Sequence, residues 1–213
     1  MLHTEVVAES TLELLKSLQS DEALASFCLA GGTSLALYLG HRVSVDLDLF
    51  TPKTFDAVKL SAYLEKKYGF RTGFLEENTL KGDIAGVKID CITHAYKSIR
   101  PPFVEDGIRL YDMADVIAMK LSAIADNGSR IKDFVDIACL SVFYSFSDML
   151  GFYERKFPTA NAIRPLKAMT YFEDIDFTEN IMMLEGDFKW SLVEKRLNGM
   201  VANPEKIYKT LPI

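Results

Sequence analysis

The sequence predicts an α+β fold, in which a mixed β-sheet with flanking helices is followed by a helical bundle. Two observations indicate this class. Before residue 112, segments with apolar residues at helical spacing alternate with short segments that read as strands. After residue 112, every patterned segment has helical spacing. We therefore expect an α/β domain at 1–111 and a helical domain at 112–213, with a boundary near Tyr111.

The expected helices of the first domain have apolar residues every three or four positions. They are predicted at 5–18, 34–39 and 55–67. A strand is predicted at 43–50, where Pro52 marks its end, and a short apolar run at 27–30 precedes a double glycine. Two or three antiparallel strands are expected between 70 and 93, with breaks at 77–78 and 81–83 and a clear alternation at 86–92.

The second domain is expected to be helical throughout. Its strongest helical patterns lie at 112–126 and 130–143, and weaker ones at 147–157, 160–169 and 189–200. Aromatic side chains at 143–146 and 152–153 are expected in the packing core, with an antitoxin-binding surface as the alternative.

The composition is that of an ordinary globular protein. Apolar residues make up 49% and charged residues 25% of the 213, which is enough for a sizeable core. The net charge of −6 disfavours a surface built throughout for nucleic acid, but it leaves room for a local basic cleft. Three cysteines without Cys-x-x-Cys spacing, Cys28, Cys91 and Cys139, are expected to be buried free thiols. Because no secretory signal or apolar run of about 18 residues is seen, we expect a cytoplasmic protein with no membrane partner.

Two aspartates alternate along the strand predicted at 43–50. On a strand, Asp46 and Asp48 point to one face, and the opposite face is expected to carry Val45, Leu47 and Leu49. Paired carboxylates repel each other unless a divalent cation relieves them. An Asp-x-Asp motif arises by chance, as at Asp174-Ile175-Asp176, which we interpret as solvated surface. If the strand that carries Asp90 lies close by, three carboxylates converge as a site for two Mg²⁺ (or Mn²⁺) ions would require.

A glycine turn precedes these carboxylates. Gly31 and Gly32 lie at a predicted helix start, where free backbone N–H groups form a natural phosphate site. The glycines could instead form only a tight connection, with Thr33 or Ser34 as a plain N-cap. With the aspartates close behind, the pattern favours an enzyme that handles a nucleoside triphosphate.

At these residues the sequence resembles a known family, the AbiEii/AbiGii-type nucleotidyltransferase toxins of the DNA polymerase β-like nucleotidyltransferase superfamily. The resemblance spans about 27–140 and rests on four stretches in the same order: Gly31-Gly32-Thr33-Ser34-Leu35-Ala36-Leu37, His41 to Phe50, Val87-Lys88-Ile89-Asp90, and the helical elements at 112–123 and 130–136. It implies a nucleotidyltransferase-like sheet fold. It also implies that the chain is the toxin of a toxin–antitoxin pair, with a cognate antitoxin as partner.

The resemblance also implies roles for individual residues. Asp46 and Asp48 would bind metal, with Asp90 as the third carboxylate and a candidate base for the incoming hydroxyl. Asp133 would be catalytic or site-ordering, and Lys120 would neutralise phosphate charge. The residues implied to contact the nucleotide are Gly31, Gly32, Thr33, Arg42, Ser44 and Lys120.

Several of these residues have a plainer structural alternative. Lys120 could be a solvated helix lysine, and Arg42 could merely flank its strand. Asp133 and Asp136 share a helix face and could only pair with Arg130 and Lys132 on its surface. The histidines, His3, His41 and His94, show no ligand spacing and are treated as incidental.

Three functional hypotheses follow. The first is a Mg²⁺-dependent enzyme that moves a nucleoside monophosphate from a triphosphate to the hydroxyl of a tRNA, a protein or a small molecule. The second is a nucleotide- or partner-binding module of the same fold without catalysis. The third is a phosphatase of the haloacid-dehalogenase type, which fits poorly because Phe50 occupies the threonine position of the Asp-x-Asp-x-Thr motif.

Overall fold

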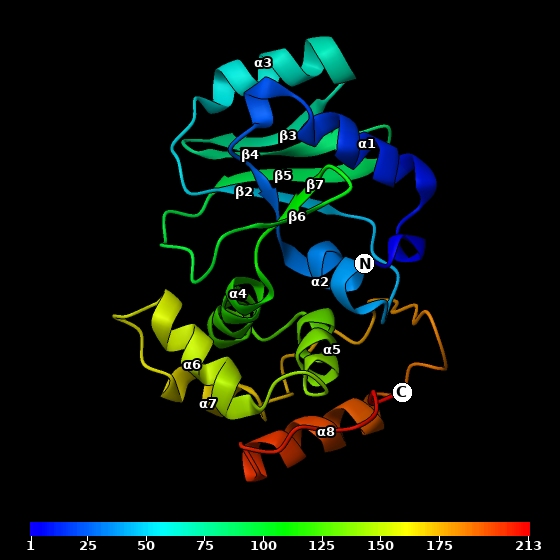
Figure 1. Cartoon of the computed structure of the whole chain (residues 1–213), viewed down its shortest axis with the longest axis vertical. Helices are drawn as coiled ribbons and strands as arrows, with labels where there is room; N and C mark the ends of the chain where they lie inside the picture. Colours follow the sequence, from blue (N-terminus) through cyan, green and yellow to red (C-terminus); the bar gives the residue numbers. More distant parts are fainter.

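The computed structural model describes all residues, 1–213, and centres on one seven-stranded mixed sheet (Figure 1). Its spatial order is β3-β4-β5-β2-β1-β7-β6. The pairs β2–β5 and β1–β7 are parallel, and the other neighbours are antiparallel. The strands are β1 (Cys28–Leu29), β2 (Leu47–Thr51), β3 (Arg71–Glu76), β4 (Thr79–Ile84), β5 (Val87–Thr93), β6 (Phe103–Glu105) and β7 (Ile108–Leu110).

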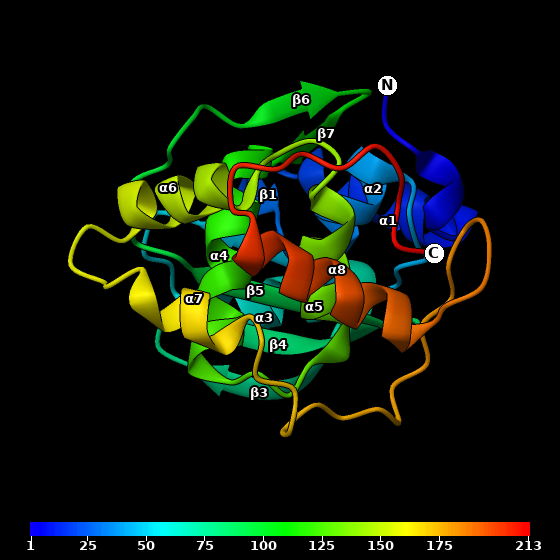
Figure 2. The same cartoon turned by 90° about the horizontal axis from the view of Figure 1, so that it is seen from below.

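The helices lie on both faces of this sheet. Figure 1 shows α1 and α3 on one face, and α2 between the other face and the remaining helices. In the view from below, α8 crosses over α5 (Figure 2). The helices are α1 (Glu9–Gln19), α2 (Gly31–Leu39), α3 (Ala57–Tyr68), α4 (Met113–Asp126), α5 (Ile131–Leu140), α6 (Phe146–Lys156), α7 (Ile163–Ala168) and α8 (Trp190–Ala202), with 3₁₀ turns η1 (Thr4–Val6) and η2 (Glu22–Leu24).

The two central strands are apolar on one face and polar on the other. Leu47 and Leu49 of β2 are fully buried in one core, as are Ile89 and Cys91 of β5. Because strand side chains alternate, the residues between them point to the opposite face, toward α2 and the helical half. The burial of the apolar face thus determines which residues of β2 and β5 are available to a site.

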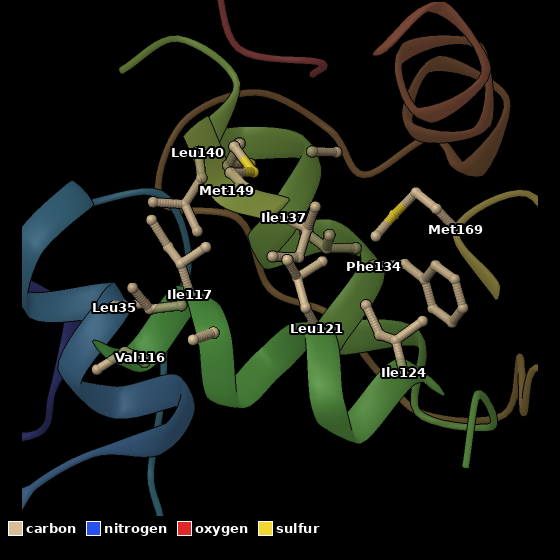
Figure 3. Packing of buried hydrophobic residues seen from close by; sticks show 14 of the residues in the cluster. Leu35, Val116, Ile117, Leu121, Ile124, Phe134, Ile137, Leu140, Met149 and Met169 are labelled. Atoms are coloured by element: carbon tan, nitrogen blue, oxygen red, sulfur yellow. The ribbon is translucent and has the colours of Figure 1, made fainter. Parts of the chain in front are cut away.

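The structure has two hydrophobic cores, and α2 contributes to both. Ala36 and Leu37 pack in the core between the sheet, α1 and α3. Leu35 packs in the helical core, beside Val116 and Ile117 of α4 (Figure 3). Full burial of a leucine contributes about 1.5–3 kcal/mol, so α2 joins the two halves firmly. The division at Tyr111 into two domains remains a prediction.

The predicted helices and most strands are present, with differences at the ends. The strand predicted at 43–50 begins only at Leu47, so Asp46 precedes it, and Val45 is 57% exposed instead of packing with Leu47 and Leu49. Segment 43–46 forms hydrogen bonds outside the sheet, such as the one from the Ser44 N–H to the Val6 carbonyl. The sheet register therefore starts later than the alternation in the sequence suggests.

The strand break predicted at 81–83 is wrong. β4 continues through Gly82, whose added Cβ would lie 2.1 Å from the Arg71 carbonyl oxygen, so this glycine permits close strand contact and does not form a turn. The turn follows at Ala85 and Gly86, both with positive φ. The strands β6 and β7 were not predicted, because three residues are too few for a recognisable alternation.

Two further expectations concern the cysteines and the membrane. All three cysteines are buried and free, as predicted. None of the helices combines the length and apolar character that crossing a bilayer requires.

Candidate functional site

The site begins at the glycine turn between β1 and α2. Gly31 has a φ of +65°, and a Cβ at this position would lie 1.8 Å from Oδ2 of Asp48. A Cβ on Gly32 would lie 2.4 Å from Nη2 of Arg42. The two glycines therefore allow the start of α2 to approach a carboxylate and a guanidinium group more closely than any other residue would.

The N-terminus of α2 has no side-chain cap. Its N-cap is Ala30, not Thr33 or Ser34 as the plain alternative supposed. The Ser34 hydroxyl donates instead to the Gly31 carbonyl, at 3.0 Å. Since the first N–H groups of a helix have no partner within it, those of the first turn of α2 remain available to an anion.

Thr33 and Ser44 connect this helix start to the segment before β2. Their hydroxyl oxygens lie 2.7 Å apart, and both residues are buried. The Thr33 hydroxyl also donates to the backbone carbonyl of Asp46. These contacts hold Asp46 beside the glycine turn, although it lies outside the strand.

Asp48 and Asp90 lie side by side. They are direct partners in the parallel pairing of β2 with β5, so both carboxylates lie on the face toward the helical half. Asp90 forms an ion pair with Lys81 of β4, at 2.9 Å between Nζ and Oδ2. With the side chains in these positions, no three Asp, Glu, His or Cys residues are grouped closely enough to hold a metal ion.

Burial raises the pKa of Asp48 to about 6. The negative charges of Asp90 and Asp46 raise this pKa further, while the positive charges of Lys120 and Arg130 oppose the rise. The Asp48 carboxylate forms no ion pair and accepts no hydrogen bond. An additional cation at this point would relieve the crowding of the carboxylates.

Beneath these carboxylates lies a buried cluster of charges centred on Asp136 of α5. Its Oδ1 accepts hydrogen bonds from His41 Nε2 at 2.8 Å and Arg42 Nε at 2.7 Å, and its Oδ2 accepts one from Arg42 Nη2 at 2.9 Å. Lys120 Nζ of α4 lies 2.9 Å from Asp136 Oδ2 and 2.5 Å from Asp133 Oδ1. We call these five residues the Asp136 cluster.

The contacts in the cluster exclude the purely surface roles that the sequence left open for Lys120, Arg42, Asp133 and Asp136. Lys120 is only 5% exposed, so it is not a solvated surface lysine, and Arg42 is buried as well. Asp133 and Asp136 pair with Lys120 and Arg42, whereas Lys132 pairs with Glu179. The sequence gives no ligand spacing that would mark His41, and it indicates Asp136 only by its position one helical turn from Asp133 on the same helix face.

The pKa values in the cluster follow from burial and pairing. Burial disfavours the charge of Asp136, but the positive charges of Arg42 and Lys120 outweigh it and hold its pKa well below the ordinary value. Burial lowers the pKa of His41, so its ring is neutral near pH 7. The cluster thus contains two cations, Arg42 and Lys120, and two carboxylates, Asp133 and Asp136, whose charges cancel.

Two adjoining hollows meet at Asp48 and Arg130. The polar one, about 190 Å³, is lined by Gly32 and by polar and charged residues that include Thr33, Arg42, Ser44, Asp46, Arg130, Lys132 and Asn180. The more apolar one, about 140 Å³, is lined by Gly31, Asp48, Phe50, Val116, Met119, Lys120, Ala123, Arg130 and Asp133. We call the two hollows together the cleft.

A segment between α7 and α8 completes one wall of the cleft. Its Met182 carbonyl accepts a hydrogen bond from the Val43 N–H at 2.8 Å, and its Leu184 N–H donates to the His41 carbonyl at 3.1 Å. Asn180 and Met182 line the polar hollow. The sequence did not indicate this wall, because the segment has no periodic pattern.

Comparisons with known proteins show the family to which the chain belongs. A family model described as nucleotidyl transferase AbiEii toxin of type IV toxin–antitoxin systems matches residues 13–189. An uncharacterised protein of Aquifex aeolicus (strain VF5) is 30% identical over 168 residues, which cover 76% of this chain and 81% of the relative.

Two solved structures are similar in fold. One is a Helicobacter pylori protein described as a candidate nucleotidyltransferase, with a TM-score of 0.55, 16% identity, and coverage of 92% of this chain and 94% of that one. The other is MenT4, a nucleotidyltransferase toxin of Mycobacterium tuberculosis H37Rv, with a TM-score of 0.56, 13% identity, and coverage of 89% and 82%.

The expected α+β, nucleotidyltransferase-like fold is thereby confirmed, and so is the resemblance drawn from the sequence. The family match extends well beyond the segment at 27–140 from which the resemblance was drawn. Nucleotidyl transfer is the activity of this family. The chain therefore belongs to the AbiEii family of nucleotidyl transferase toxins from type IV toxin–antitoxin systems.

Proposed function

We propose that the protein transfers a nucleoside monophosphate from a nucleoside triphosphate to an acceptor hydroxyl, with Mg²⁺ or Mn²⁺ as cofactor and release of pyrophosphate. The observation that carries this proposal is the pairing of Asp48 with Asp90 directly beside the uncapped start of α2. A phosphate site and a carboxylate pair are thereby next to each other, as nucleotidyl transfer requires.

The metal ligands would be Asp46, Asp48 and Asp90. Oxygen donors of this type suit Mg²⁺. The pKa of Asp48 is raised mainly by burial and further by the charges of Asp90 and Asp46, and a bound cation would offset both effects. For all three to act together, Lys81 must release Asp90 and the Asp46 side chain must turn toward Asp48. When bound, divalent cations supply charge neutralisation on the phosphates and activation of the attacking oxygen.

The polar hollow would hold the triphosphate. Gly32 and Thr33 at the start of α2, Ser44 and Arg130 all line it, and Gly31 lines the adjoining hollow, so the N–H groups of this helix start would reach the phosphates. Arg42 lines this hollow and Lys120 lines the adjoining one. Both are paired with carboxylates, so they would act on the phosphates at short range without adding net charge to the site. Neither hollow alone reaches the ~300 Å³ typical of ligand pockets, so a nucleotide would occupy both, with its nucleoside in the more apolar one.

The acceptor hydroxyl would lose its proton to Asp90, the third carboxylate, while Asp133 and Lys120 order the opposite wall of the cleft. A tRNA end, a protein side chain and a small molecule all provide such a hydroxyl. As the toxin of its pair, the protein would have a cognate antitoxin as partner.

An incubation of the purified protein with each of four triphosphates, labelled at the α-phosphate, tests this proposal. The reactions contain Mg²⁺ and either total RNA, cell protein or no acceptor. We expect label from at least one nucleotide to become attached to one acceptor class. Nucleotide binding without transfer in any mixture would instead favour the catalytically inactive binding module.

A further inference from the structure

The Asp136 carboxylate connects three walls of the cleft at once. Its hydrogen bonds to His41 and Arg42 hold the segment that continues to Ser44 and Asp46. Its ion pair with Lys120 holds α4, and Asp136 itself belongs to α5. No other carboxylate of the chain forms contacts with so many elements of the site.

Arg42 extends these connections to the glycine turn. Its Nη2 lies close enough to Gly32 that a Cβ there would be only 2.4 Å away. The guanidinium group is therefore packed between Asp136 and the first turn of α2. A shift of this group would move the helix start and the segment with Ser44 and Asp46 relative to each other.

We propose that Asp136 is a positioning residue, which anchors segment 41–46 on α4 and α5 and so determines where Asp46 and Ser44 lie in the cleft. This inference rests on the proposed function for its effect on turnover, but the anchoring itself is independent of it. Asp136 lines neither hollow, so it acts through His41, Arg42 and Lys120 and does not touch the nucleotide.

The charge balance of the cluster gives this role a distinctive signature. Arg42 and Lys120 are neutralised by Asp133 and Asp136, while His41 is neutral. Asp136→Asn removes one negative charge and leaves the positive charge near the cleft in excess. The excess positive charge favours nucleotide binding and the displacement of Ser44 opposes it, so the nucleotide Kd should change little, while turnover falls because the anchored segment is displaced.

A matched control exists in the same half of the protein. Asp115 and Lys156 form an equally buried ion pair, at 2.7 Å between Oδ1 and Nζ, which lines neither hollow. Asp115 also accepts hydrogen bonds from the N–H groups of Ile99 and Arg100. Asp115→Asn thus breaks a comparable buried pair and releases a different segment.

The first measurement is amide hydrogen exchange in the full-length protein, which needs no activity. We expect Asp136→Asn to raise exchange at Val43 and Ser44, whose N–H groups bond to Met182 and Val6, and Asp115→Asn to raise it at Ile99 and Arg100. Unchanged exchange at Val43 and Ser44 in folded Asp136→Asn would overturn the anchoring. This result would stand whether or not the wild type proves to be a nucleotidyltransferase.

The second measurement compares the transfer rate at saturating nucleotide with the nucleotide Kd, using the triphosphate that the wild type transfers. In Asp136→Asn we expect the rate to fall about 100-fold, as for small misplacements of reacting groups, with a much smaller change in the nucleotide Kd. Asp115→Asn should keep a rate close to wild type even though its thermal stability falls. Equal losses of rate in the two variants would show that Asp136 has only a structural role.

A second pair of variants covers the case in which Asp136→Asn does not fold. His41→Leu removes one hydrogen bond to Asp136 without changing the charge, and His41→Gln restores a donor in the place of Nε2. We expect His41→Leu to lower the rate and raise exchange at Val43, and His41→Gln to rescue both. A wild-type rate and wild-type exchange in folded His41→Leu would contradict the proposal.

Discussion

Asp48 of β2 and Asp90 of β5 are direct partners across a parallel pair of strands. Their neighbours Leu47, Leu49 and Cys91 are buried in the core on the other face. A slip of one residue in this pairing would turn one carboxylate into that core. The hydrophobic packing beneath the sheet therefore maintains the juxtaposition on which the proposed chemistry depends.

The protein should be more stable at pH 7 when Asp48 is replaced by Asn. The folded state raises the pKa of Asp48 from 3.8 to about 6, so between these values the folded chain retains a proton that the unfolded chain has released. Stability is therefore lost as the pH rises through this window, by up to about 3 kcal/mol.

Chemical denaturation without Mg²⁺ at pH 4 and pH 7 measures this effect. Asp48→Asn should exceed the wild type in free energy of unfolding at pH 7 and match it at pH 4. Asp174→Asn, the same change at an exposed position, should differ at neither pH. A less stable Asp48→Asn at pH 7 would show that the carboxylate is satisfied in the fold.

Replacement of Gly31 by Ala should abolish activity as well as lower stability. Gly31 and Gly69 have nearly the same φ, +65° and +69°, so alanine at either position costs about 1–2 kcal/mol of backbone strain. Only at Gly31 does the new Cβ also collide with Asp48, since nothing lies within 4 Å of the one at Gly69.

Thermal unfolding and transfer assays on the two alanine variants separate these effects. We expect Gly69→Ala to lose stability but keep the wild-type transfer rate, and Gly31→Ala to lose both. Full activity in Gly31→Ala would mean that Asp48 can move away without consequence, which its proposed role as metal ligand does not allow.

Arg130 should bind the triphosphate directly. It is exposed, forms no ion pair, and lies where the two hollows meet. Arg130→Gln should raise the nucleotide KM about tenfold, which corresponds to the loss of one charge-assisted hydrogen bond of roughly 1.4 kcal/mol.

The control for Arg130 is Arg164→Gln, which removes an exposed arginine that pairs with Asp126 and lines neither hollow. Its KM should equal that of the wild type. An unchanged KM in Arg130→Gln would place the phosphates elsewhere in the cleft.

Much of the fold, and the residues that meet at the candidate site, could be predicted from the sequence. Helical spacing of apolar residues identified all eight α-helices, most of which bury an apolar face in one core, while α2 packs in both. The alternation around Asp90 identified β5, and the glycine turn identified the start of α2 within three residues. These signals are local, so a single sequence shows them.

The remaining features depend on contacts between distant segments. The pairing of β2 with β5 is parallel and joins strands far apart in the chain. The sequence alone therefore does not show whether the strand with Asp90 lies beside the strand with Asp48. His41 and Asp136 lie far apart in the chain, so their contact cannot be predicted from either local sequence and is seen only in the folded structure. The segment around Met182 lacks any pattern because it binds through its backbone.

The most direct test of the account is a comparison of triphosphates labelled at the α- and at the γ-phosphate, with wild type, Asp48→Asn and Asp90→Asn, in Mg²⁺ and in chelator. We expect the wild type to transfer the α-label only, in Mg²⁺ only, and each variant to be slower by about 100-fold or more. Transfer of the γ-label, or a wild-type rate in either variant, would contradict nucleotidyl transfer at the Asp48–Asp90 pair.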